Sequence, residues 1–170
     1  PARSRSPEAA REEVKRLVRA GFREIVLTGV NLGAYGRDLG TSLAALLREL
    51  VRVPGLGRLR LSSVEPQYFG PDLVGVVAAE EKICPHWHIP LQSGDGAVLR
   101  RMGRGYTPED YRALVERLRR GRPDGAVTTD VIVGFPGEEE AAFGRTLALV
   151  EDVGFSRLHV FAYSPRRGTP

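Results

Sequence analysis

The segment Val127–Glu138, with the sequence VTTDVIVGFPGE, decides the fold because its pattern is typical of a buried strand that stops abruptly. β-Branched residues dominate its first half and suit a strand that is packed on both faces. Gly134, Pro136 and Gly137 cannot continue that strand, so a tight loop follows it. Backbone N–H groups of such a loop, and of a helix after it, collect at the carboxyl end of the strand, where parallel α/β folds bind ligands.

The residues beyond this loop predict an amphipathic helix that opens at Glu138. Its apolar residues recur at helical spacing and should form one buried face, made of Phe143, Leu147, Val150 and Val153. Four further strands are predicted, at residues 24–28, 59–63, 86–91 and 158–163. Helical patterns that begin near Pro7, Leu43, Pro71 and Thr107 alternate with the strands.

Alternation of this kind implies parallel strands that are joined by right-handed crossovers. A closed eight-stranded barrel needs about 250 residues, whereas this chain has 170. We therefore expect an α/β fold in which five parallel strands form either a partial (β/α) TIM-like barrel or an open sheet.

The composition narrows the classes of protein further. Hydrophobic residues make up 42% and charged residues 27% of the chain, as in soluble globular domains. No apolar run approaches the roughly 20 residues of a membrane span, so we expect no membrane partner. The single cysteine, Cys84, excludes an internal disulfide framework and fits the cytoplasm. The net charge of +4 permits a nucleic-acid partner without proving one.

Polar residues and glycines follow all five predicted strands. Exposed loops would explain any one of these clusters, but in a parallel barrel all five meet at one rim. Together they favour a site over five unrelated loops. The clusters are Thr28–Asn31, Ser62–Glu65, Gln92–Asp95, Gly134–Glu138 and Tyr163–Arg166.

Asp130 lies within an apolar strand, where an unpaired carboxylate would be costly. It is therefore either paired or functional, and we favour a functional role. Two arginine clusters flank the predicted rim and are candidates for phosphate contacts. These clusters are Arg100, Arg101 and Arg104, and Arg166 with its neighbour Arg167.

Cys84, His86 and His88 alternate, so an extended chain would point all three to one side, where they could hold zinc. Pro85 and Pro90 break regular geometry, and neither a CxxC nor an HExxH motif supports such a site. We favour histidines that form hydrogen bonds inside the barrel mouth, and we predict no metal ligands. His159 is expected to be a structural histidine of the core or rim.

These motifs resemble those of the radical S-adenosylmethionine (SAM) methylthiotransferases, a family of iron–sulfur transferases. The matching stretches cover almost the whole chain in family order, and they are EIVLTGVNLGAY at 24–35, RLSSVEP at 60–66, CPHWHIPLQSG at 84–94, TDVIVGFPGE at 129–138 and HVFAYSPRRGTP at 159–170. The stretches SVEP and CPH look most like the branch that acts on threonylcarbamoyladenosine in tRNA. Branches that act on isopentenyladenosine in tRNA or on a ribosomal protein are the alternatives.

The resemblance implies a cytoplasmic tRNA-modifying enzyme that inserts a methylthio group at C2 of N6-threonylcarbamoyladenosine next to the anticodon. It implies SAM and [4Fe-4S] clusters as cofactors, tRNA as a partner, and a protein that donates electrons. It implies no particular oligomer. In the family a CxxxCxxC loop after the first strand holds the radical cluster, and Cys84 alone cannot replace three ligands. We therefore expect residues 1–170 to be a partial radical SAM core that is inactive alone. The first strand, the cluster loop, the N-terminal cluster-binding domain and the C-terminal RNA-binding domain should be missing.

The resemblance also assigns roles by motif position. Asp130 and Glu65 are the expected catalytic residues, and the arginines Arg100, Arg101, Arg104 and Arg166 are expected to bind substrate. The expected SAM-binding residues are Thr28, Gly29 and Asn31 near the amino and carboxylate groups, Gln92 and Ser93 near the ribose, Val133, Gly134 and Glu138 near the adenine, and Tyr163 at the rim.

Two other classes of function stay open on the residues alone. A barrel enzyme without a metal, such as a phosphate-binding lyase, needs a phosphate-gripping loop, and residues 134–137 are the only candidate. A non-catalytic RNA-binding module needs a rim that is basic but closed.

Overall fold

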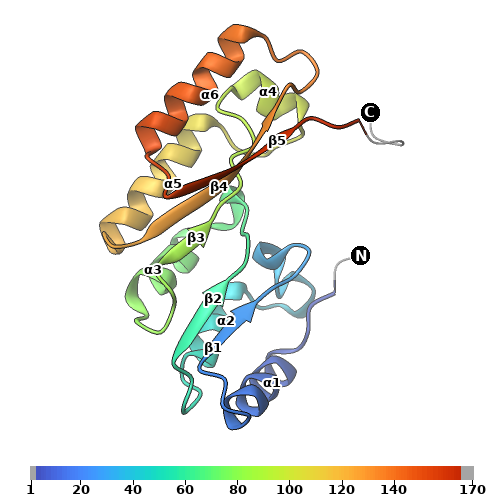
Figure 1. Cartoon of the computed structure of the whole chain (residues 1–170). Helices are drawn as coiled ribbons and strands as arrows, with labels where there is room; N and C mark the ends of the chain where they lie inside the picture. The colour runs from blue at the N-terminus through green and yellow to red at the C-terminus, as the bar shows by residue number, and fades with distance from the viewer. Residues whose placement is uncertain (1–2, 166–170) are drawn as a thin grey trace.

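A computed structural model describes residues 3–165 of the chain (Figure 1). Its five strands are β1 (Glu24–Leu27), β2 (Arg58–Leu61), β3 (His86–His88), β4 (Ala126–Val133) and β5 (Arg157–Ala162). The α-helices are α1 (Pro7–Arg19), α2 (Leu43–Leu50), α3 (Pro71–Ala79), α4 (Gly96–Arg101), α5 (Pro108–Gly121) and α6 (Glu140–Val153). Short 3-10 turns are η1 (Leu32–Ala34), η2 (Arg37–Leu39) and η3 (Pro66–Tyr68).

All strand pairs are parallel. β1 pairs with β2, and β4 lies between β3 and β5. Backbone hydrogen bonds around Leu59 join the two groups, because its N–H donates to Lys82 and its carbonyl accepts from Cys84. The strands therefore follow one another in chain order, as expected for a partial (β/α) barrel.

Helices cover one face of the strands and leave the other open (Figure 1). The covered face is apolar: Trp87 on β3 and Val127 on β4 are fully or almost fully buried, together with Tyr111 and Leu118 on α5. Successive residues of a strand point to opposite faces, so the polar residues of β3 and β4 that alternate with this core lie on the open face.

Three details differ from the sequence-based expectations. β3 ends at His88, not at residue 91, and Pro90 beyond it has no N–H to extend the ladder. The helix α4 was not predicted; its N-cap is Asp95, whose Oδ1 accepts from the Val98 N–H at 2.8 Å. α6 begins at Glu140 and not at Glu138.

The predicted inner face of α6 is also wrong at one position. Leu147 is 47% exposed, whereas Thr146 beside it is 2% exposed. The Thr146 hydroxyl accepts the Gly94 N–H at 2.9 Å. Because of this polar contact Thr146 lies on the inner face of α6. A pattern of apolar residues cannot predict a buried contact of this kind.

β1 is an edge strand within residues 3–165, since it pairs with β2 on one side only. Val26 on this strand is 53% exposed. A missing first strand, as the motif resemblance implies, would leave such an open edge at residues 24–28. No helix in the described part of the chain is long and apolar enough to cross a membrane.

The contact between Gly94 and α6 gives a test of the packing. A Cβ on Gly94 would come within 2.6 Å of the Thr146 Cα and 2.9 Å of the Arg145 carbonyl oxygen. We predict that Gly94→Ala lowers the free energy of unfolding by about 1–3 kcal/mol, because backbone atoms cannot yield as side chains do. Urea denaturation of the chain measures this change.

Gly144→Ala, in the exposed face of α6, is the matched control. No atom lies within 4 Å of its added Cβ, so this change should raise the free energy of unfolding by about 0.5–1 kcal/mol through helix propensity. Equal effects of the two substitutions would show that α6 does not pack closely on Gly94.

Candidate functional site

The carboxyl ends of the five strands meet at one edge of the fold, because all strands run in the same direction. The five polar clusters predicted from the sequence follow these ends. This edge is called the rim below.

The β1 segment of the rim lines a groove of about 800 Å³ between α1 and β1. Thr28, Gly29 and Asn31 lie along it, together with apolar side chains of α1 and β1. The Asn31 Nδ2 donates to the Tyr68 hydroxyl at 2.8 Å. The predicted residues for the SAM amino and carboxylate groups are therefore accessible from one groove.

The β3 segment of the rim contains Gln92, which has a φ of 67°. It is the one non-glycine residue with positive φ in residues 3–165. Such backbone strain costs of order 1–3 kcal/mol and often marks functional sites. Gln92 is held by β4, since its N–H donates to the Asp130 carbonyl at 2.8 Å and its own carbonyl accepts from Ile132 at 2.9 Å. Its buried Oε1 has no partner among the described residues.

Ser93, the next residue in the chain, contacts the helix α6. It is fully buried, and its hydroxyl lies 3.3 Å from Thr146 Oγ1 and accepts from the Asp95 N–H at 3.1 Å. Within the described structure, Ser93 therefore connects the rim to α6, whereas Gln92 presents a free acceptor.

The β4 segment forms the predicted glycine loop. The Glu138 carboxylate accepts the Gly134 N–H at 2.6 Å, and its other oxygen is buried with no partner in residues 3–165. The Tyr163 N–H donates to the Val133 carbonyl, and the Tyr163 ring packs edge-on against Phe135 at 5.3 Å. Val133, Gly134, Glu138 and Tyr163 are thus brought together.

One of the predicted phosphate-binding arginines contacts Glu65, and another contacts the loop after β4. Glu65 Oε1 accepts from Arg104 Nη1 at 2.9 Å. Arg101 Nη2 donates to the Gly137 carbonyl at 2.7 Å, so this arginine touches the β4 loop. Arg100 is exposed. Arg166 lies outside the described residues.

Asp130 lies on the open face of β4, and its carboxylate is paired with two histidines. The sequence leaves two possibilities for this carboxylate, a pairing partner or a functional role. Its Oδ2 is 3.1 Å from His88 Nε2, and its Oδ1 is 3.1 Å from His159 Nδ1. His88 Nδ1 lies 3.0 Å from Thr128 Oγ1, which is also 3.2 Å from His86 Nε2. The expectation that strand histidines form hydrogen bonds at the barrel mouth is therefore confirmed.

His88 and His159 were not among the predicted site residues. The signal that could have identified them is register: Asp130 pairs with His159 across β4 and β5, and Thr128 pairs with His88 across β3 and β4. Sequence alternation within one strand does not give the alignment between strands. From their positions at or near strand ends, the sequence also predicts one cavity shared by Asp130, Glu65 and Gln92, and this stays a prediction.

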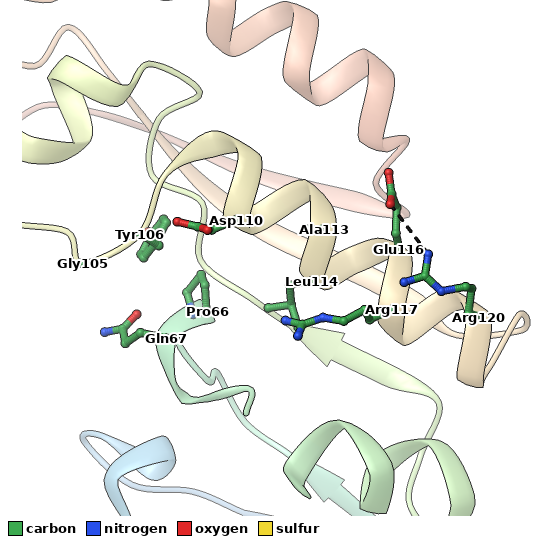
Figure 2. Close-up of a pocket in the computed structure, with 10 residues that line it drawn as sticks. All are labelled: Pro66, Gln67, Gly105, Tyr106, Asp110, Ala113, Leu114, Glu116, Arg117 and Arg120. Carbon is green, nitrogen blue, oxygen red and sulfur yellow. Dashed lines mark ion pairs between the residues drawn. The ribbon is translucent and has the colours of Figure 1, made fainter. Parts of the chain in front are cut away.

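A second hollow, of about 360 Å³, lies between η3 and α5 (Figure 2). It contains none of the predicted SAM-binding residues. Its lining includes Gln67, Asp110 and the exposed ion pair of Glu116 and Arg120. The hollow is formed by a helix surface and is separate in its residues from the rim.

The fold and the rim define a class of protein: a partial parallel β/α barrel with polar clusters at its strand ends. The family description of the Radical SAM superfamily matches residues 1–150. The chain belongs to the radical SAM superfamily, whose chemistry uses SAM and a [4Fe-4S] cluster.

The chain is 51% identical over 168 residues to the threonylcarbamoyladenosine tRNA methylthiotransferase MtaB of Thermotoga maritima. The match covers 99% of this chain and 39% of that protein, so the chain spans about two fifths of the length of this relative.

Solved structures show the same fold. The radical SAM methyltransferase TsrM of Kitasatospora setae, with cobalamin and a [4Fe-4S] cluster bound, matches with a TM-score of 0.74 and 21% identity, over 93% of this chain and 31% of that chain. Coproporphyrinogen III oxidase HemN of Escherichia coli matches with a TM-score of 0.64 and 19% identity, over 93% of this chain and 37% of that chain.

The described residues fit SAM at the rim. Gln92 and Glu138 each present a buried oxygen acceptor with no partner in residues 3–165, and SAM offers amino and hydroxyl donors. The chain does not fit a [4Fe-4S] cluster, because such clusters take several cysteine thiolates and this sequence has one cysteine. Burial raises the pKa of the Cys84 thiol, which further disfavours a thiolate there.

This burial gives a second test. We predict that Cys84 of the native chain reacts with a disulfide reagent much more slowly than after denaturation, because each unit of raised pKa lowers the thiolate fraction about tenfold and the side chain is only 4% exposed. Absorbance of the released thiol measures the rates. A native rate that equals the denatured rate would contradict the buried position of Cys84.

Proposed function

We propose that this chain is the SAM-binding and substrate-binding part of a cytoplasmic enzyme that inserts a methylthio group at C2 of N6-threonylcarbamoyladenosine next to the anticodon of tRNA. The observation that carries the proposal is the 51% identity to MtaB over nearly the whole chain. That identity is far above the 19–21% shared with radical SAM proteins of other activities.

The residues of the rim supply binding and orientation. SAM, when bound, supplies radical chemistry and a methyl group. Thr28, Gly29 and Asn31 would hold its amino acid end from the β1 groove. Gln92 would accept a hydrogen bond from the ribose, and the loop after β4 would enclose the adenine, with Gly134 and Glu138 as its polar contacts.

Asp130 and Glu65 would act on the substrate side. Asp130 lies on the open face, where its carboxylate is oriented by two imidazoles. Burial, helped by the charge of Arg60, lowers the pKa of His86, which favours the neutral form of this imidazole next to the cluster. Glu65 is oriented by Arg104, which ties this carboxylate to the arginine cluster that we propose for tRNA phosphates. An electron-donor protein completes the set of partners.

Methylthiolation of isopentenyladenosine or of a ribosomal protein would use the same fold. A non-catalytic RNA-binding module is the alternative from another class. Each of these alternatives would give a different modified product, or no modified tRNA nucleoside, in the chimera experiment described next.

The experiment is a chimera in which this chain replaces the matching segment of the Thermotoga maritima enzyme. We predict that the chimera, expressed in a bacterium without its own enzyme of this kind, produces tRNA nucleosides whose threonylcarbamoyladenosine is heavier by a methylthio group. Mass spectrometry of digested tRNA detects the product. A folded chimera that modifies isopentenyladenosine instead, or no nucleoside, would contradict the proposed substrate or the proposed activity, respectively.

The same chimera tests the arginine cluster. Arg100→Ala should weaken tRNA binding and reduce the slope of log affinity against log salt by somewhat less than one, as expected for one lost phosphate contact. Arg120→Ala, in the exposed pair with Glu116 on α5, is the control and should leave the slope unchanged. Equal slopes for both variants and the parent would remove Arg100 from the tRNA surface.

A further inference from the structure

The open face of the sheet brings together two imidazoles and one carboxylate from three different strands. Asp130 on β4 is the register partner of His159 on β5, and Thr128, two residues earlier on β4, is the partner of His88 on β3. Residues two apart on a strand share a face. Parallel pairing therefore places His88, Asp130 and His159 side by side, although they are distant in sequence.

The possible ligand atoms of these three residues all lie within 4.8 Å of one another. Asp130 is central: each of its oxygens lies 3.1 Å from one imidazole nitrogen. The two rings are themselves close, with centroids 5.7 Å apart. Ligand atoms bound to one ion at about 2.0–2.2 Å are at most about 4.4 Å apart. The two 3.1 Å contacts of Asp130 lie within this range, and an ion would draw the two imidazole nitrogens into it as well.

From this geometry we propose that His88, Asp130 and His159 bind one divalent transition-metal ion on the open face of the sheet. Two imidazoles and a carboxylate are a donor set that suits zinc and the neighbouring first-row metals. Within the part of the chain that the structure describes, the histidine, cysteine and acidic side chains with metal-binding geometry are those of His88, Asp130 and His159. Cys84 and His86 are not part of this group. The site therefore differs from the zinc arrangement that sequence alternation suggested.

The side chains next to the group support metal binding. Ligating histidines usually hydrogen-bond through their second nitrogen, which fixes the ring and the tautomer. His88 has this partner, because its Nδ1 lies 3.0 Å from Thr128 Oγ1. Thr128 is in turn 3.2 Å from His86 Nε2. With a metal on Nε2, His88 can donate through Nδ1 to Thr128, and Thr128 can donate to His86.

The site is also accessible from one side. The side chains of His88 and Asp130 are 18% and 23% exposed, and that of His159 is 49% exposed. An ion can therefore enter from the open face. Three protein ligands leave at least one coordination position free, as in metal sites that bind a substrate or water. Asp130 also has a substrate-side role in the proposed function, but ion binding is measured on this chain without SAM or tRNA, so failure of one proposal is distinguishable from failure of the other.

Cobalt(II) is the probe, since its visible absorption reports both binding and ligand type. We expect the anaerobic 170-residue chain to bind one equivalent of cobalt without a thiolate charge-transfer band, and zinc to displace it. His88→Gln, Asp130→Asn and His159→Gln should each abolish saturable binding. Thr128→Val keeps a β-branched side chain and should weaken binding by about 10- to 100-fold. Circular dichroism confirms that each variant is folded.

Cys84→Ala is the matched control and should retain binding, whereas His86→Gln should weaken binding no more than Thr128→Val does. Loss of binding in Cys84→Ala, or a thiolate band, would assign the metal to Cys84, His86 and His88 and overturn the proposal. Absence of saturable cobalt binding by the folded parent chain would show that Asp130 only accepts hydrogen bonds from the two histidines, and it would overturn the proposal as well.

Discussion

β4 is hydrogen-bonded along both edges, to β3 on one side and to β5 on the other, and the positions of His88, Asp130 and His159 on the open face depend on this double pairing. A slip of one residue would exchange the two faces of a strand. Thr128 and Asp130 would then enter the core, and Val127 and Val131 would leave it. Burial of Val127 and Val131 beneath the helices therefore fixes Thr128 and Asp130 on the open face.

The same strand positions the rim. Gln92 exchanges backbone hydrogen bonds with Asp130 and Ile132 on β4, so its unusual backbone conformation is held from outside its own loop. The next residues, Ser93 and Gly94, are tied to Thr146 of α6. The QSG turn is thus held by a strand on one side and a helix on the other. A strained backbone conformation persists only with such rigid support.

Much of this arrangement could be predicted from the sequence. The run VTTDVIVGFPGE predicted the buried strand and its loop, and the alternation of strand and helix patterns predicted five parallel strands. Other features depend on contacts that periodicity does not contain. The inward face of α6 is set by the hydroxyl of Thr146, and α4 is a six-residue helix that depends on its cap, Asp95. His159 joins Asp130 only through the register of β5. Motif resemblance suggested roles for the rim residues but gave no distances between them.

The central claim is that SAM binds at the rim formed by the strand ends. NMR of the isotopically labelled chain during titration with SAM tests it most directly. The backbone amide signals of Gly29, Gln92 and Gly134 should shift with one common dissociation constant. The amides of Gly105 and Arg117, in the hollow between η3 and α5, should not shift. Shifts that are confined to this hollow, or no shift at any rim amide at the highest SAM concentration, would contradict SAM binding at the rim.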